Sequence, residues 1–195
     1  GSQRFQKPVS IKQALDELCA AARQQADAAD SRYTAVDYET WNAICERFAP
    51  VVKLEGDERP KARSVTQTVA RRLAALVRDN PRWAPDQIAR EILAGIFRAA
   101  DKLEKHLAAT GYRERKAIIK LANLYNTAVV FSREPYRAEG DYLAAYKADI
   151  ARQEAFGRLR GALHQPSDES SAIQITGFSV DAKGCPRYNG LLVCR

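Results

Sequence analysis

Residues 64–87 read SVTQTVARRLAALVRDNPRWAPDQ, and this stretch decides the fold class. Ser64 and Gln67 form a capping box, in which each side chain satisfies a free backbone amide at the start of a helix. Apolar residues then recur at helical spacing: Val65, Val69, Leu73, Leu76 and Val77. Asn80-Pro81 ends this pattern, and Pro85 suits the first turn of a second helix, where its missing amide costs nothing. The stretch therefore predicts two consecutive helices joined by a short turn.

Four more helical patterns surround this pair. Ser10 and Gln13 form another capping box, and Asp37 can cap a helix that Pro50 stops. The helix that starts at Pro85 runs to Gly111, and the next one is broken at Glu134-Pro135. For the helix after Asp37 we expect a buried stripe of Tyr38, Trp41, Ile44, Cys45 and Phe48. For the last helix we expect a buried stripe of Leu143, Tyr146, Ile150, Leu159 and Leu163.

The composition changes after the last helical pattern. Residues 165–171 form a polar linker, and the apolar period then falls from 3.6 to 2. Ile173 and Ile175 alternate with polar residues, and a bulge at Gly177 could switch the inward side to Phe178 and Val180. Residues 181–184 supply a turn before a returning strand. We therefore predict a mostly α fold: a compact multi-helix domain over residues 3–164, the linker, and a small β-hairpin over residues 172–195 packed on the same domain.

The composition is that of an ordinary globular protein. The 195 residues are 46% hydrophobic and 28% charged, with a net charge of +7. The chain has no apolar run long enough to span a membrane, and Ile11, Leu15 and Leu18 are separated by polar residues where a signal peptide would need an apolar core. These features predict a cytoplasmic protein whose partners are anionic.

Nothing in the sequence marks a catalytic or metal centre. His106 and His164 are the only histidines, and the four cysteines show no CxxC spacing. No Gly-rich phosphate loop, HExxH or GxSxG motif occurs. We predict a protein that is not an enzyme and that holds no metal and no cofactor. Cys19 and Cys45 are expected in the core, while Cys185 and Cys194 flank the predicted hairpin and could pair or stay reduced.

The excess positive charge lies between residues 59 and 120. Residues 59–82 hold seven Lys or Arg against one Asp, and residues 98–120 hold seven against three acidic residues. Two basic groups precede or open helices, where backbone amides already favour an anion. We expect these side chains to gather into one surface that binds RNA or another anion: Arg59, Lys61, Arg63, Arg71, Arg72, Lys102, Lys105, Arg113, Arg115 and Lys116. Tyr112 could stack on an unpaired base or pack at a helix start. The alternative for the whole set is a solvated helix surface.

Three stretches of the chain resemble the FinO/ProQ family of RNA-binding proteins. Glu46-Arg47-Phe48 followed by residues 55–61 is similar to that family's helix end and basic, Arg-Pro-containing entry to the next helix. Pro85-Asp86-Gln87-Ile88 resembles the start of a family helix, and residues 180–186 resemble the family's Asp-x-x-Gly-x-Pro hairpin turn. The family's Gln-Leu-Arg reads Gln87-Ile88-Ala89 here, so Arg90 falls on another helix face.

The resemblance implies a helical domain whose basic face binds structured RNA, often a stem with a single-stranded 3′ tail. It also implies a role in regulating plasmid conjugation by fertility inhibition, with Arg59 and Lys61 in the basic entry. The added helices after Gly111 and the altered motif around Arg90 favour an alternative. In that alternative the same fold is a protein-binding inhibitor that meets an acidic surface of the conjugation (type IV secretion) machinery without binding RNA.

Overall fold

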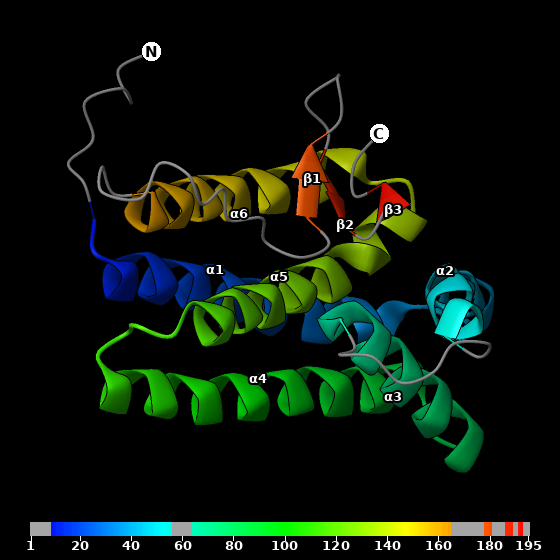
Figure 1. The fold of residues 1–195 in the computed structure, drawn as a ribbon. Coiled ribbons are helices and arrows are strands. Elements are labelled where there is room, and N and C mark those ends of the chain that lie inside the picture. The colour runs from blue at the N-terminus through cyan, green and yellow to red at the C-terminus, as the bar shows by residue number, and fades with distance from the viewer. Residues whose placement is uncertain (1–8, 56–63, 165–177, 181–185, 189–190, 193–195) are drawn as a thin grey trace.

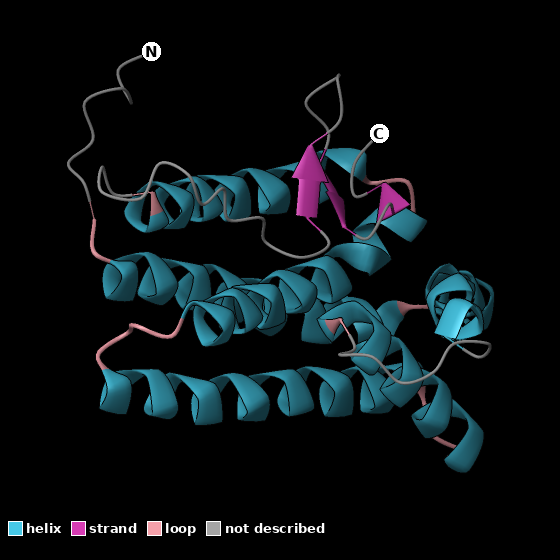
Figure 2. Cartoon of the chain, viewed as in Figure 1, coloured by secondary structure: helices cyan, strands magenta, loops and turns pink. Residues whose placement is uncertain are grey.

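The structure, a computed structural model, describes residues 9–55, 64–164, 178–180, 186–188 and 191–192. Helices dominate this part of the chain, which confirms the predicted class (Figure 2). The helices are α1 (Ile11–Ala35), α2 (Tyr38–Glu55), α3 (Val65–Asp79), α4 (Pro85–Thr110), α5 (Arg115–Ala138) and α6 (Tyr142–Leu163).

The four longest helices form three layers (Figure 1). α6 forms one outer layer, α1 and α5 form the middle layer, and α4 lies on the far side of that middle layer. α2 and α3 pack on each other at one end of the molecule, where α3 also contacts α4 and α5. α4 and α6 therefore present faces that point away from each other.

α5 is the central helix. It contacts α1, α2, α3, α4 and α6, and residues 121–135 are buried without a break. The burial covers polar as well as apolar residues, because Asn126, Arg133 and Glu134 are each 1% exposed or less. Charged groups at such depth need partners, and they find them on α6 and α2.

The predicted helix starts at Ser10, Asp37 and Ser64 and the predicted stop at Gly111 are confirmed. The Ser64 hydroxyl accepts a hydrogen bond from the Gln67 amide at 3.2 Å, while the Gln67 side chain accepts one from the Ser64 amide at 3.0 Å. Ser10 and Gln13 make the same box. Asp37 accepts a hydrogen bond from the Thr40 amide at 2.7 Å at the start of α2. Gly111 closes α4 with φ of 70°, a left-handed conformation that favours glycine.

Two predicted helix stops are wrong. Pro50 lies inside α2, which continues to Glu55, and Pro135 lies inside α5, which continues to Ala138. A proline inside a helix removes one hydrogen bond at a cost of about 3 kcal/mol. Packing offsets this cost here, because Val51 is buried just after Pro50 and Pro135 is itself buried.

One predicted apolar stripe is also partly wrong. Leu159 and Leu163 of α6 are buried, but Leu143, Tyr146 and Ile150 are exposed. The buried face of α6 uses small residues and Phe156 instead: Ala145, Ala148, Ala155, Phe156 and Ala162. Tyr38, placed in the stripe of α2, is 72% exposed. α6 thus carries apolar residues on two faces, and only one of them is buried by the residues that the structure describes.

The C-terminal region contains the short strands β1 (Phe178–Val180), β2 (Pro186–Tyr188) and β3 (Leu191–Leu192). β2 pairs antiparallel with both neighbours, with Phe178 opposite Tyr188 and Arg187 opposite Leu192. The linker at 165–171, the predicted turn at 181–184, Cys185 and Cys194 lie outside the described residues. The hairpin over residues 172–195 and its packing therefore stay a prediction. Among the described helices, none combines the length and apolar character that a membrane crossing requires.

Candidate nucleic-acid interface

A tight turn sets α4 and α5 side by side. Near this turn the His106 Nε2 atom lies 2.6 Å from Glu114 Oε2, which joins the last turns of α4 to the start of α5. The two helices run antiparallel from there, so positions along α4 face positions along α5 in reverse order. Side chains three or four residues apart share one face of a helix. Rows of such side chains on α4 and on α5 therefore lie next to each other along the line where the two helices meet, which we call the seam.

A groove lies where α3 meets the seam. It has a volume of about 400 Å³, and apolar side chains from all three helices form its floor: Val65, Val69, Ile92, Ile96 and Leu124. Three cationic side chains also line it, namely Arg72 of α3, Arg98 of α4 and Lys120 of α5. An apolar floor with a cationic rim is a surface that can take both the flat face of a base and its phosphate.

The cations extend beyond the groove along the seam. Lys102 follows Arg98 by one turn of α4, Lys105 follows by a further turn, and Lys116 precedes Lys120 by one turn of α5. Within the described part of the chain, Lys102, Lys105, Lys116 and Lys120 are exposed and form no ion pair with a carboxylate. We call the residues Arg72, Arg98, Lys102, Lys105, Lys116 and Lys120 the seam face.

Glu91 lies against the seam face and pairs with two of its cations. Its Oε1 atom is 3.6 Å from Arg72 Nη2 and 3.3 Å from Arg98 Nη2. This shared carboxylate orients both guanidinium groups at the rim and neutralises only part of their charge. The seam face therefore keeps a clear excess of positive charge.

The predicted site residues are brought together only in part. Arg72, Lys102, Lys105 and Lys116 lie on the seam face, while Arg71 is half-buried on α3. Arg113 is exposed in the turn before α5, and Arg115 is half-buried at the start of that helix. Arg59, Lys61 and Arg63 lie outside the described residues.

Two members of the seam face, Arg98 and Lys120, are absent from the predicted set. Their helical spacing could have found them, because Arg98 is one turn from Lys102 and Lys120 is one turn from Lys116. Arg78, another cation of the basic segment, behaves differently. Arg78 turns to its neighbour Asp79, with Nε 2.9 Å from Oδ1.

Tyr112 is engaged within the protein. Its hydroxyl donates a hydrogen bond to Glu104 Oε1 at 2.6 Å, and its half-buried ring packs against the core. This hydrogen bond raises the pKa of Tyr112 to about 12. The backbone is left-handed at Tyr112, with φ of 57°, which a tyrosine adopts at some cost. The packing interpretation of Tyr112 is therefore better supported than base stacking.

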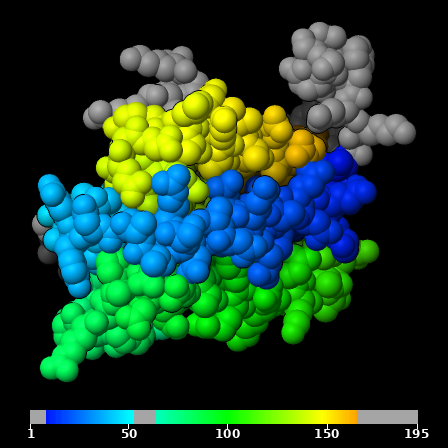
Figure 3. All heavy atoms as spheres, turned by 180° about the vertical axis from the view of Figure 1, so that it is seen from behind, coloured from blue at the N-terminus to red at the C-terminus, as the bar shows by residue number. Residues whose placement is uncertain are grey.

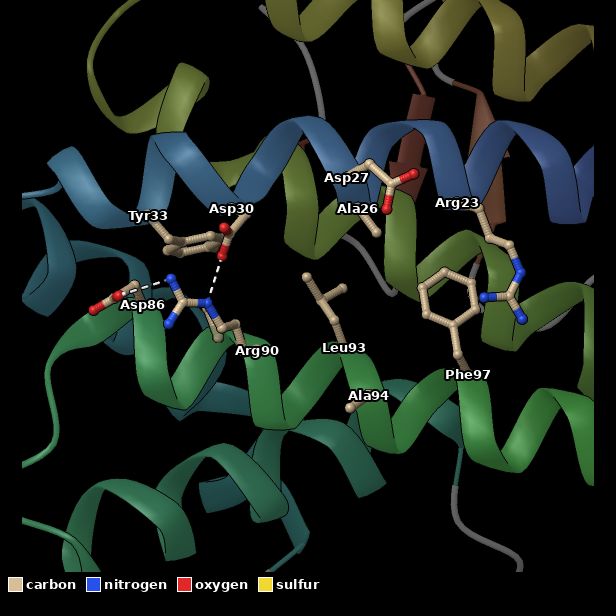
Figure 4. Close-up of a pocket in the computed structure, with 11 residues that line it drawn as sticks. Arg23, Ala26, Asp27, Asp30, Tyr33, Asp86, Arg90, Leu93, Ala94 and Phe97 are labelled. Atoms are coloured by element: carbon tan, nitrogen blue, oxygen red, sulfur yellow. Dashed lines mark hydrogen bonds and ion pairs between the residues drawn. The ribbon is translucent and has the colours of Figure 1, made fainter.

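The other side of α4 has a different character. There a groove of about 300 Å³ lies between α1 and α4, lined by Arg23, Asp27, Asp30, Asp86 and Arg90 (Figure 4). Arg90 bridges the two helices, with Nε 2.5 Å from Asp30 Oδ1 and Nη2 3.1 Å from Asp86 Oδ2. The hydrogen bond to Asp30 raises the pKa of Arg90. Because its cations are paired, this groove has no positive excess to offer an anion.

The described residues contain no group of three His, Cys, Asp or Glu side chains that could hold a metal ion. His106 is bonded to Glu114, and His164 caps the end of α6. Cys19 and Cys45 are half-buried against the core, which agrees with their predicted packing role.

No protein-family model matches the chain, and a search of curated proteins finds no relative. The FinO/ProQ resemblance therefore stays a prediction that rests on the short motifs quoted above.

Proposed function

We propose that this protein is a non-catalytic, FinO/ProQ-like binding protein that takes structured RNA on the seam face. The observation that carries the proposal is the arrangement of Arg72, Arg98 and Lys120 around one groove with an apolar floor. Phosphates of a stem would contact the lysines along the seam, and an unpaired nucleotide would enter the groove. The role in regulating plasmid conjugation follows from the family resemblance alone.

Electrostatics supports RNA over a small ligand. The seam face runs along two helices, and its cations repeat at each turn of about 5.4 Å. A repeating row of this kind suits the repeating charge of a phosphate backbone, which supplies affinity without sequence selectivity. The C-terminal hairpin, predicted to pack on the helical domain, completes the FinO/ProQ-like fold in this proposal.

Fluorescence anisotropy with a labelled RNA stem that ends in a single-stranded 3′ tail tests the proposal. We expect binding at low salt that weakens steeply as salt is added, because each neutralised phosphate releases counterions. The Arg98→Ala/Lys120→Ala double variant should bind at least about tenfold more weakly, with a salt slope smaller by about two. The matched control, Arg78→Ala/Arg160→Ala, removes the same charge from exposed positions elsewhere and should change affinity by less than about twofold.

Absence of RNA binding by the wild-type protein at low salt rejects this function. Equal losses in the seam variant and in the control would show a net-charge effect without a site. Both results are separable from misfolding, because all four side chains are exposed and circular dichroism reports the helices directly.

The pairing of Arg90 favours the alternative function. The position where the resemblance implies an RNA-contacting arginine holds Ala89, and Arg90 next to it lies on another helix face. There its guanidinium is held by Asp30 and Asp86. A protein-binding inhibitor of the conjugation machinery would use the seam face against an acidic partner surface. Affinity capture from conjugating cells distinguishes the two, because the alternative predicts recovery of a protein that survives nuclease treatment.

A further inference from the structure

α6 exposes a row of large apolar side chains on the outer layer of the molecule. Leu143 is 64% exposed, Tyr146 46% and Ile150 37%, and their spacing of three and four residues places them on one helix face. Seen from behind, α6 lies above α1, which separates it from α4 below (Figure 3). Contiguous exposed apolar residues of this kind mark a contact with another macromolecule.

The same row continues toward the C-terminal end of α6 with glycines. Gly157 and Gly161 are exposed, and a Cβ atom added at either would meet nothing within 4 Å. The N-terminal half of the face therefore carries large apolar side chains, and the C-terminal half carries two glycines. Glycine costs helix stability at an exposed position, so its presence twice in this row calls for a packing reason.

The two halves are complementary to each other when two copies of α6 pack in antiparallel orientation. A two-fold axis that passes between Ile150 and Glu154 sets Leu143 of one copy opposite Gly161 of the other. The same axis brings the exposed Lys147 within one turn of the exposed Glu154 of the second copy. Bulk thus meets space and positive charge meets negative charge, as a self-complementary interface requires.

We propose that this face of α6 is the interface of an antiparallel homodimer. The seam face does not compete with it, because α4 lies in the opposite outer layer from α6 (Figure 1). The cationic surfaces of the two copies consequently stay apart. A contact along one helix of 22 residues is near the lower end of stable interfaces, so we expect micromolar affinity.

Sedimentation velocity of the full chain from about 1 to about 200 µM tests the dimer. The wild-type protein should shift from monomer toward dimer over this range. Gly161→Leu fills the space that the second copy needs and should raise the dissociation constant at least about tenfold. It should not lower the melting temperature, because leucine is the better helix former and has open space in the monomer. The control Ala108→Leu adds the same bulk at an exposed site on α4 and should leave the dimer unchanged.

Charge exchange tests the orientation. Lys147→Glu and Glu154→Lys should each weaken the dimer, and the double exchange should restore it. The proposal is wrong if the wild-type protein stays monomeric at the highest concentration. It is equally wrong if Gly161→Leu dimerises as strongly as the wild type. None of these readouts depends on RNA binding.

Discussion

Arg133 illustrates how far this protein places charge inside its core. It is fully buried, and its Nε atom lies 3.3 Å from Asp149 Oδ1 of α6. Asp149 also accepts hydrogen bonds from Arg152 Nη2 at 3.0 Å, and Arg152 reaches Asn126 of α5 at 2.7 Å. Asp149 therefore pairs with a buried guanidinium group on each helix, which ties α5 and α6 in a single register. A second buried carboxylate, Glu134, has its Oε1 atom 3.7 Å from Arg133 Nη2.

Removing that carboxylate should be costly. We expect Asp149→Ala to lower the free energy of unfolding by about 3–5 kcal/mol, because buried Arg152 loses its carboxylate partner and buried Arg133 keeps only Glu134. Urea unfolding followed by circular dichroism measures the loss. The control Asp16→Ala breaks an exposed pair with Lys12 and should cost far less. Similar losses in the two variants would contradict the ionic role assigned to Asp149.

Cys45 provides a prediction on pH. Burial raises the pKa of its thiol to about 11, so only about one molecule in a thousand carries the reactive thiolate at pH 8. Alkylation of Cys45 in the folded protein should be roughly a hundredfold slower than in urea, where the pKa is about 8.5. The folded rate should rise about tenfold for each pH unit between 8 and 10. Peptide mass spectrometry resolves Cys45 from the other cysteines, and a rate independent of pH would contradict the shift.

At the scale of elements, the ends of helices follow from local sequence. Ser64 and Gln67 complete their box with neighbouring residues, so no distant contact is needed to start α3. We expect Ser64→Ala to cost about 1 kcal/mol in unfolding free energy and to speed hydrogen exchange in the first turn of α3. Ser31→Ala, inside α1 and away from its N-cap, is the matched control and should be close to neutral. Equal effects would show that the cap contributes nothing at Ser64.

Elements that depend on distant partners were predicted less well. Periodicity located the apolar residues of α6, but a helix with apolar residues on two faces does not reveal which face the chain covers. The local cost of a proline predicts that helices end at Pro50 and Pro135. The burial of residues around them outweighs that cost, and both helices continue. Charge counts identify the basic segment, but they do not show which of its cations share one surface. Packing decides that Arg98 and Lys120 join Arg72, while Arg78 turns to Asp79.

At the scale of the whole molecule, three layers separate the two surfaces for which we propose different tasks. The seam face needs an excess of positive charge, and the outer face of α6 needs a nearly neutral, self-complementary surface. α1 and α5 lie between the two surfaces (Figure 1). The positive charge of the seam face and the near neutrality of the outer face of α6 are therefore independent of each other. If both proposals hold, a dimer displays two seam faces that point in different directions and can hold two RNA stems.

This geometry predicts cooperative binding to an RNA that carries two stems. Binding the first copy places a second stem-bound copy at an effective concentration in the millimolar range, above the micromolar dissociation constant expected for the dimer. The two-stem RNA should therefore bind the second copy at least about tenfold more tightly than an isolated stem does. Gly161→Leu should abolish this gain while single-stem affinity stays unchanged, and Arg98→Ala/Lys120→Ala should weaken both. Cooperativity that persists in Gly161→Leu would place the coupling in the RNA, because the variant leaves the seam face intact and removes only the contact between copies.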